Sequence, residues 1–222
     1  ITISLKATQA GGNLTSFYVT NPDATVDTVE ANIAAGEYSY SHTVTLVAGT
    51  TYTYAYTVMN AENKSASQTI TITATTPLAY SNLDGYISHR WGQYKGAYDL
   101  AANMEMAQGD PDANKDMENT TANGAVFTAT WKAGAGNTSM FTKVEGYDFA
   151  NATLENAATA YAAGDAAGEI TDEAVVGDVF IGKLRGADQY VAMQVTEVSV
   201  DDKSGTGFMR FTYKKTAETA GQ

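Results

Sequence analysis

The chain has 222 residues, a formal net charge of −12 and no cysteine, and 44% of its residues are hydrophobic against 17% that are charged. Such a chain is globular and long enough for one large or two ordinary domains. Missing cysteines exclude disulfides, thiolate metal sites and a cysteine nucleophile, and the acidic balance argues against a partner that is nucleic acid or an anionic membrane.

The first third of the chain alternates apolar and polar residues with the period of β-strands. Ile1, Ile3 and Leu5 alternate with polar neighbours, and Tyr52, Tyr54 and later residues repeat the pattern. The predicted strands lie within residues 1–6, 17–20, 38–46, 52–58 and 69–73. Short strands at this spacing, divided by Gly, Pro and Asn turns, predict a β-sandwich.

Residues 46–54, Leu-Val-Ala-Gly-Thr-Thr-Tyr-Thr-Tyr, carry a family resemblance. They resemble the corner between strands E and F of fibronectin type III and related immunoglobulin-like modules, in which a Tyr after a Gly-Thr turn is tied to the backbone. The resemblance implies an immunoglobulin-like module over residues 1–76. Pro77 interrupts the strand pattern, so we place a second domain at residues 77–222.

The second domain is predicted to be β-rich with one short helix. Residues 80–98 are rich in Gly, Tyr and Trp without sustained periodicity, a strand is expected to begin at residues 98–101, and residues 126–131 alternate like a strand. Thr153 is placed to cap a helix over residues 154–162, with Gly164 to end it. Strands at 179–184, 190–200 and 208–213 form a predicted antiparallel meander, giving a mostly all-β fold overall.

The second domain also resembles a group of outer-surface lipoprotein ectodomains of Bacteroidetes that have no known activity. The matching landmarks are residues 96–100, 110–116, 124–127, 141–144, 147–153, 177–186 and 211–215. The resemblance implies export and tethering to the cell surface through a lipidated cysteine upstream of Ile1. Asp27, Thr28 and Val29 are also similar to an O-glycosylation site used in that phylum.

An acidic loop over residues 110–118 is the candidate metal site. Asp110, Asp112, Asn114, Asp116 and Glu118 alternate like the oxygen ligands of a calcium loop. Lys115 replaces the glycine that such a loop needs at its sharp turn, and Thr121 replaces the bidentate glutamate. We therefore predict that this loop is a solvated acidic loop, and we expect no bound metal ion.

Signatures of cofactors and catalysis are weak. His42 falls on a strand face as a packing residue, and a haem would need His89 with Met104 or Met106 as axial ligands, so no cofactor is expected. Serine-hydrolase, zinc-protease and phosphate-loop motifs are missing from the sequence. A pair of carboxylates for glycoside cleavage stays open because their separation in space is not visible in a sequence.

Aromatic residues provide the candidate binding site. Sugars stack their C–H faces on aromatic rings while planar polar groups take the hydroxyls. The predicted ligand-binding residues are Tyr86, Arg90, Trp91, Tyr94, Tyr98 and Trp131. The alternative is that Trp91 and Trp131 are core residues, because aromatic side chains commonly anchor β-rich cores.

These observations predict a non-catalytic, exported surface module for binding or adhesion, with a glycan or another extracellular polymer as its partner. A hydrolase acting on such a polymer is the alternative from another class, and a structural component of a surface assembly is the third. An open edge strand would indicate the last of these.

Overall fold

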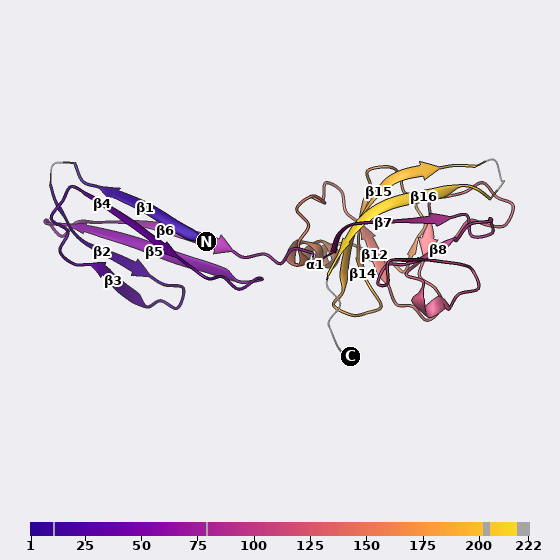
Figure 1. The fold of residues 1–222 in the computed structure, drawn as a ribbon, viewed down its shortest axis with the longest axis horizontal. Helices are drawn as coiled ribbons and strands as arrows, with labels where there is room; N and C mark the ends of the chain where they lie inside the picture. The colour runs from indigo at the N-terminus through magenta and orange to yellow at the C-terminus, as the bar shows by residue number, and fades with distance from the viewer. Residues whose placement is uncertain (11, 79, 202–204, 217–222) are drawn as a thin grey trace. The chain divides into compact units, whose positions relative to one another are not determined.

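The computed structural model describes residues 1–10, 12–78, 80–201 and 205–216, which form two compact units, Ile1–Thr75 and Thr76–Gln222. Their boundary lies one residue before the one predicted from Pro77. Both units are built from antiparallel strands, so the predicted mostly all-β fold with one short helix is confirmed (Figure 1). No helix among the described residues has the length and apolar character needed to cross a bilayer.

Unit 1 is a sandwich of two sheets. Its strands are β1 (Thr2–Thr8), β2 (Leu14–Thr20), β3 (Val26–Glu30), β4 (Glu37–Thr43), β5 (Thr51–Asn60) and β6 (Ser65–Thr73). β1 pairs with β4, and the second sheet has the order β3-β2-β5-β6. Inward side chains of both sheets, among them Ile3, Phe17, Tyr54 and Tyr56, form one core.

The corner before β5 confirms the tie that the sequence predicts. The backbone N–H of Val47 donates to the hydroxyl oxygen of Tyr52 over 3.0 Å. Gly49, with a φ of 79°, occupies the left-handed turn that a side chain would strain. His42 packs on the rings of Tyr40 and Tyr54, at centroid distances of 5.1 and 5.8 Å, which is the packing role expected of it.

Unit 2 also encloses its core between two sheets. Its strands are β7 (Tyr80–Ser88), β8 (Ala97–Asp99), β9 (Met104–Met106), β10 (Met117–Asn119), β11 (Trp131–Lys132), β12 (Met140–Lys143), β13 (Glu169–Ile170), β14 (Val179–Lys183), β15 (Tyr190–Ser199) and β16 (Phe208–Lys215). A 3-10 turn, η1, spans Asp112–Asn114, and the helix α1 spans Leu154–Ala163. The sheets have the orders β12-β14-β15-β16-β7 and β13-β11-β10-β8-β9.

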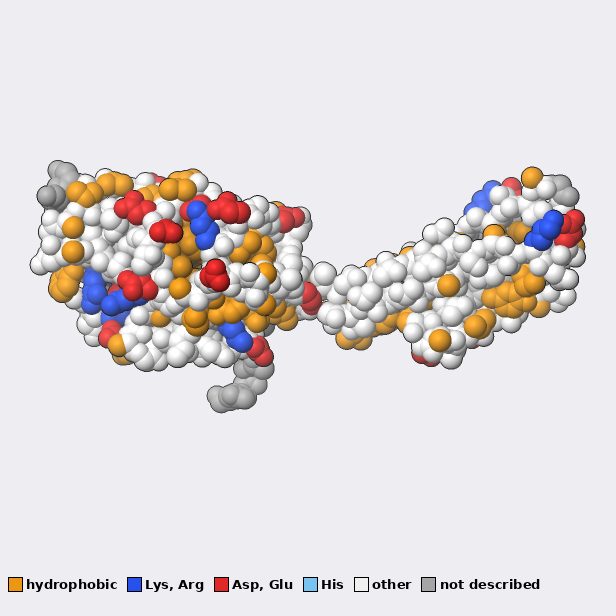
Figure 2. All heavy atoms as spheres, turned by 180° about the vertical axis from the view of Figure 1, so that it is seen from behind, with side chains coloured by type: hydrophobic (Ala, Val, Ile, Leu, Met, Phe, Trp, Pro, Cys, Tyr) orange, Lys and Arg blue, Asp and Glu red, His pale blue; other side chains and the backbone are white. Residues whose placement is uncertain are grey.

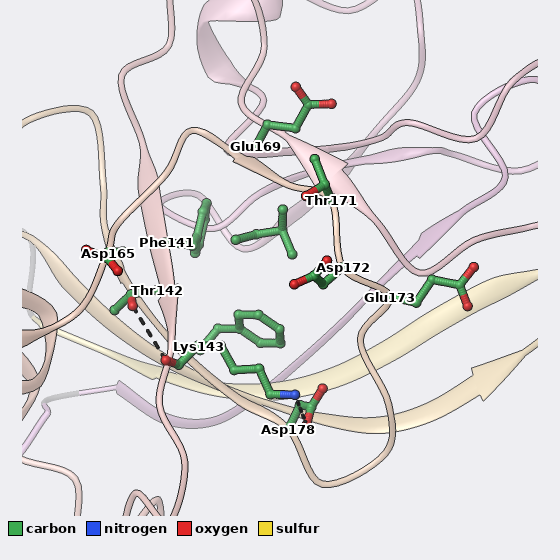
Figure 3. Close-up of a pocket in the computed structure, with 11 residues that line it drawn as sticks. Phe141, Thr142, Lys143, Asp165, Glu169, Thr171, Asp172, Glu173 and Asp178 are labelled. Atoms are coloured by element: carbon green, nitrogen blue, oxygen red, sulfur yellow. Dashed lines mark hydrogen bonds and ion pairs between the residues drawn. The ribbon is translucent and has the colours of Figure 1, made fainter.

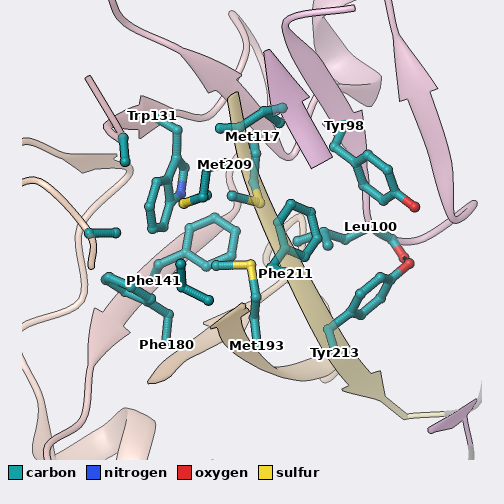
Figure 4. Packing of buried hydrophobic residues seen from close by; sticks show 14 of the residues in the cluster. Tyr98, Leu100, Met117, Trp131, Phe141, Phe180, Met193, Met209, Phe211 and Tyr213 are labelled. Carbon is teal, nitrogen blue, oxygen red and sulfur yellow. Dashed lines mark hydrogen bonds between the residues drawn. The ribbon is translucent and has the colours of Figure 1, made fainter. Parts of the chain in front are cut away.

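The predicted meander is the centre of unit 2. β14, β15 and β16 pair in sequence order, and the alternate residues Val191, Met193 and Val195 are at most 1% exposed. On β16 the inward set of Met209, Phe211 and Tyr213 is equally buried. These side chains belong to one core cluster with Trp131, Phe141 and Phe180. Figure 4 shows Met193 and Met209 near those three rings, and Tyr213 beside Leu100 and Tyr98.

Helix α1 forms where its cap was predicted. The Thr153 hydroxyl accepts from the N–H of Asn156 at 3.2 Å, and the Asn156 side chain accepts from the N–H of Thr153 at 2.7 Å. This reciprocal pair satisfies two donors at the start of the helix. Leu154, Ala157 and Tyr161 pack on the face of β14 and β15 opposite the main core, so the helix covers that face of the sheet.

The first residues of unit 2 are fastened to this helix. The N–H and hydroxyl of Thr76 donate to the Glu155 carboxylate at 2.9 and 2.7 Å, and the N–H of Leu154 donates to the Thr76 carbonyl at 2.8 Å. Burial raises the pKa of Glu155, but the hydrogen bonds from Thr76 outweigh it and hold that pKa below its usual value.

Two predictions of local structure are wrong. Residues 80–88, expected to be irregular, form β7, which pairs with β16. Its Gly85 takes an inward position where an added Cβ would lie 2.7 Å from the Phe211 ring. Residues 126–130, expected to be a strand, are irregular. The Asn119 side chain donates to the carbonyls of Thr128 and Thr130 at 2.9 and 3.0 Å, so side-chain bonds replace a strand ladder there.

Buried tyrosines make unit 2 sensitive to alkali. Burial raises the pKa of Tyr213 far above the ordinary tyrosine value of about 10. Burial also raises the pKa of Tyr147 to about 12. The unfolded chain ionises these phenols from about pH 10, while the folded unit keeps them protonated. We expect the free energy of unfolding to fall between pH 10 and 12, by at most about 1.4 kcal/mol per pH unit for each tyrosine. Urea unfolding followed by circular dichroism measures this slope, and Tyr213→Phe should make it shallower; an equal slope in the variant would contradict the assignment.

Candidate functional site

The six predicted binding residues fall into two groups. Trp131 is fully buried and Tyr98 is 3% exposed, so these two are core residues and their assignment to a binding surface is wrong. Their rings fill the space between the sheets, where Trp131 stacks edge-on against Phe180 at 4.8 Å. The remaining residues, Tyr86, Arg90, Trp91 and Tyr94, reach the surface to different extents.

Tyr86 and Tyr94 line one groove of about 350 Å³, together with Ser88, Thr206, Phe208 and Arg210. We call it the Tyr86 groove. In the paired strands β7 and β16, Tyr86 lies opposite Arg210 and Ser88 opposite Phe208. These residues occupy the outward positions of strands whose inward residues, Ile87 and Met209, are fully buried. The alternation that builds the core thereby places the groove on the opposite face of the sheet.

Polar groups flank the rings of the Tyr86 groove. The Arg210 guanidinium lies 5.2 Å from the centroid of the Phe208 ring, and its Nε is 3.5 Å from the Glu197 carboxylate. Burial raises the pKa of Tyr86, and a hydrogen bond with Glu105 raises it further, so the phenol is a hydrogen-bond donor at neutral pH. The groove therefore offers apolar ring surface beside donors and acceptors.

Trp91 and Arg90 lie outside the residues that line this groove. Trp91 is 48% exposed, and the Arg90 guanidinium is 5.4 Å from the centroid of its ring. Arg90 is partly buried, with its Nε 3.5 Å from Glu118. Phe208 and Arg210 line the groove but were not among the predicted binding residues, although their outward positions on the predicted strand were visible in the sequence.

A second pocket, of about 220 Å³, is acidic. It is lined by Phe141, Thr142, Lys143, Asp165, Glu169, Ile170, Thr171, Asp172, Glu173, Asp178 and Phe180 (Figure 3). Figure 2 shows acidic side chains around exposed hydrophobic ones on one face of unit 2. Sequence reasoning missed this pocket, which we call the Asp172 pocket; the density of acids over residues 165–178 was its only signal.

Both carboxylate oxygens of Asp178, in the Asp172 pocket, have partners among the described residues. Its Oδ1 lies 2.8 Å from the Lys143 ammonium, and its Oδ2 accepts from the N–H of Val175 at 2.9 Å. The hydrogen bond with Asp178 raises the pKa of Lys143. Among the described residues, no three His, Asp or Glu side chains are grouped closely enough to hold a metal ion.

The loop weighed as a calcium site contains its own cation. Lys115 is fully buried, and its ammonium lies 2.7 Å from Asp112 and 3.5 Å from Glu118. The hydrogen bond to Lys115 lowers the pKa of Asp112. Asp110 accepts from the N–H of Ala107 at 2.7 Å, so these carboxylates are directed to groups of the protein itself.

His89 is engaged on both ring nitrogens. Its Nδ1 accepts from the N–H of Trp91 at 3.1 Å, so its Nε2 donates to the Ala125 carbonyl at 3.0 Å. The side chain is 2% exposed. Of the two methionines considered with it, Met104 is half exposed and Met106 is buried. The arrangement describes a structural histidine in the loop that follows β7.

Comparison with known proteins gives no functional assignment. No family model matches the chain, and no curated protein matches it. Among solved structures, a DUF4466 family protein from Parabacteroides merdae, a member of the Bacteroidetes, is 10% identical with a TM-score of 0.38; the match covers 97% of this chain and 85% of that one. At this level of likeness it supports no argument about ligand or activity.

Proposed function

We propose that the protein is a non-catalytic binding module that docks a glycan or a similar extracellular polymer on the Tyr86 groove. The observation that supports this is the gathering of Tyr86, Tyr94 and Phe208 on one outward face of unit 2, beside hydroxyl groups and Arg210. Sugar rings stack on such side chains, and their hydroxyls bond to the planar polar groups beside them.

Unit 1 serves in this proposal as an immunoglobulin-like spacer. The Tyr52 tie at the corner before β5 is typical of such modules. The sheet order β3-β2-β5-β6 also matches the C′-C-F-G sheet of the immunoglobulin-like fold, with β1 and β4 in the places of B and E. Export and a lipid anchor at the cell surface belong to the same proposal and rest on the sequence resemblance alone.

The proposal is tested by affinity electrophoresis of the full chain through gels that contain neutral or acidic polysaccharides. We expect the wild type to be retarded by at least one polysaccharide, and Tyr94→Ala with Phe208→Ala to weaken binding about tenfold or more, because each ring removed costs about 0.5–1.5 kcal/mol of stacking. Trp91→Ala is the matched control, since Trp91 is exposed to about the same extent as Tyr94 but does not line the groove.

Retardation by none of the polysaccharides, or an equal loss with Trp91→Ala, would reject the groove as the binding site. Release of reducing ends from a bound polysaccharide would instead favour the hydrolase, for which the carboxylates of the Asp172 pocket are the available groups. In that case Asp172→Asn should abolish the release while the double variant of the groove retains it.

A further inference from the structure

One edge of β1 has no partner strand in the described part of unit 1. β1 belongs to a two-stranded sheet with β4 alone. Ile1 exchanges hydrogen bonds with Val44, and the N–H of Gln9 donates to Gly36, so the odd-numbered residues face β4. By the alternation of an antiparallel ladder, the N–H and C=O groups of Thr2, Ser4, Lys6 and Thr8 point to the other side. This edge is a template for a further strand.

A groove of about 280 Å³, with both apolar and polar residues in its lining, adjoins that edge. It is lined by Leu5, Lys6, Ala7, Thr8, Phe17, Tyr56, Val58, Ala66, Ser67 and Gln68, which come from β1, β2, β5 and β6. We call it the Tyr56 groove. On β6 the residues at this end, Ala66 and Gln68, are exposed, whereas Ile70 and Ile72 further along are partly covered. The sandwich is therefore open between the edge of β1 and β6.

One residue that lines the groove, Tyr56, has a buried hydroxyl without a partner among the described residues. Tyr56 is only 3% exposed, and its hydroxyl has no hydrogen-bond partner among the described residues. Burial raises the pKa of this tyrosine to about 12, so the phenol keeps its proton at neutral pH. A buried hydroxyl without a partner destabilises the fold, because its lost hydrogen bonds to water are not replaced. A ligand that reaches into the groove and accepts this proton would recover that cost.

We propose that unit 1 accepts an extended peptide strand from a protein partner, which adds to the open edge of β1 and covers the Tyr56 groove. Its backbone pairs with the outward groups of β1, and its apolar side chains, two residues apart, enter the groove between Leu5 and Ala66. A carbonyl or polar side chain of the strand accepts from Tyr56. This inference concerns unit 1 and is independent of the glycan proposal for unit 2.

Charge favours a foreign strand that carries an acid over a second copy of this chain. Lys6 is the charged side chain among the residues that line the groove, and its contact with Glu37, at 2.9 Å, joins two side chains that are more than half exposed. Such a surface pair contributes little and is readily exchanged. Pairing two β1 strands would bring only a second Lys6, whereas an acidic residue on the incoming strand gives Lys6 a new partner.

The test uses the full chain and capped nine-residue peptides in which valine alternates with threonine and one threonine is replaced by glutamate at each position in turn. Binding is measured by calorimetry, and hydrogen exchange of backbone amides is followed by NMR. We expect at least one peptide to bind and to slow exchange at Ser4, Lys6 and Thr8 without a matching change at Leu5 and Ala7, which already bond to β4.

Lys6→Pro removes one outward N–H and leaves the pairing with β4 intact, so we expect a loss of binding of about tenfold or more with little loss of stability. Lys6→Ala is the matched control, because it removes only the charge, and it should weaken binding about two- to threefold and reduce its dependence on salt. Tyr56→Phe should weaken binding while leaving stability unchanged or slightly higher, since the deleted hydroxyl has no partner in the protein.

Three results would overturn the proposal. One is the absence of binding by every peptide at about 1 mM, the limit of a useful association. Another is protection on the free edges of β3, β4 or β6 instead of β1. The third is self-association of the wild type in sedimentation that Lys6→Pro abolishes, which would assign the edge to a second copy. The exchange measurement on the wild type still decides the matter if Lys6→Pro fails to fold.

Discussion

Arg185→Ala is expected to lower the free energy of unfolding of unit 2 by about 3–5 kcal/mol, the usual cost of leaving a buried charge without its partner. The Arg185 guanidinium lies 2.6 Å from Asp99 and 3.0 Å from Asp116. Those carboxylate side chains are 5% and 0% exposed. Ser139 and Asn137 also donate to Asp116, but they bring no charge.

The control variants separate the charge from its geometry. Arg185→Lys keeps the charge but loses the forked contact to both carboxylates, so its loss should be intermediate. Arg210→Ala removes an arginine whose pair with Glu197 is more than half exposed, and it should cost less than about 1 kcal/mol. Arg185 has a φ of 53°, in the left-handed region. Ala and Lys have the same backbone strain at this position, so that strain does not affect the comparison between the two variants. Urea unfolding measures the difference; a loss for Arg185→Ala no larger than that of Arg210→Ala would refute the argument.

Trp131→Ala should cost about 3–5 kcal/mol because it leaves a large cavity in the core of unit 2. The indole is fully buried and makes edge-on contacts with Phe141 and Phe180 at 6.0 and 4.8 Å. Its Nε1 has no hydrogen-bond partner among the described residues. Trp131→Phe keeps most of the volume and loses no hydrogen bond, so it should cost clearly less than the alanine variant.

Trp91→Ala is the matched control for this position, since half of that ring is exposed and its removal should change stability by no more than about 0.5 kcal/mol. Denaturation followed by circular dichroism gives the three values on one scale. Equal losses for Trp91→Ala and Trp131→Ala would show that burial does not decide the stability contribution of the two tryptophans.

The alternation of apolar and polar residues was sufficient to predict those strands in which large apolar side chains occupy every inward position. The meander from β14 to β16 and the cap at Thr153 were predictable because each depends on a local pattern. β7 was missed because its inward Gly85 leaves room for the rings of Phe211 and Tyr98, which are distant in sequence. That compensation involves the neighbouring strand and is invisible in a local window.

The candidate site was predicted in part for a related reason. The sequence identifies the aromatic residues. It does not show on which face of a sheet an aromatic side chain lies when its strand is short and bordered by loops. Tyr86 lies at an outward position once β7 is recognised as a strand, whereas Trp131 begins a two-residue strand whose inward direction depends on the pairing of β11 with β10 and β13. The acids of the Asp172 pocket come from one stretch, residues 165–178, but the pocket forms only where that stretch meets Phe141, Thr142 and Lys143 of β12.

The attachment of Thr76 to Glu155 and Leu154 has a mechanical consequence. A pull on the chain that enters unit 2 at Thr76 is taken up first by the opening turn of α1, through the Glu155 carboxylate and the Leu154 amide. These bonds load in parallel with the bridge between Pro77 and Thr153, so they must break together rather than in succession. Under tension, the helix and the strands that it packs on therefore bear the force first. β7 bears no load until the bonds between Thr76 and the helix break.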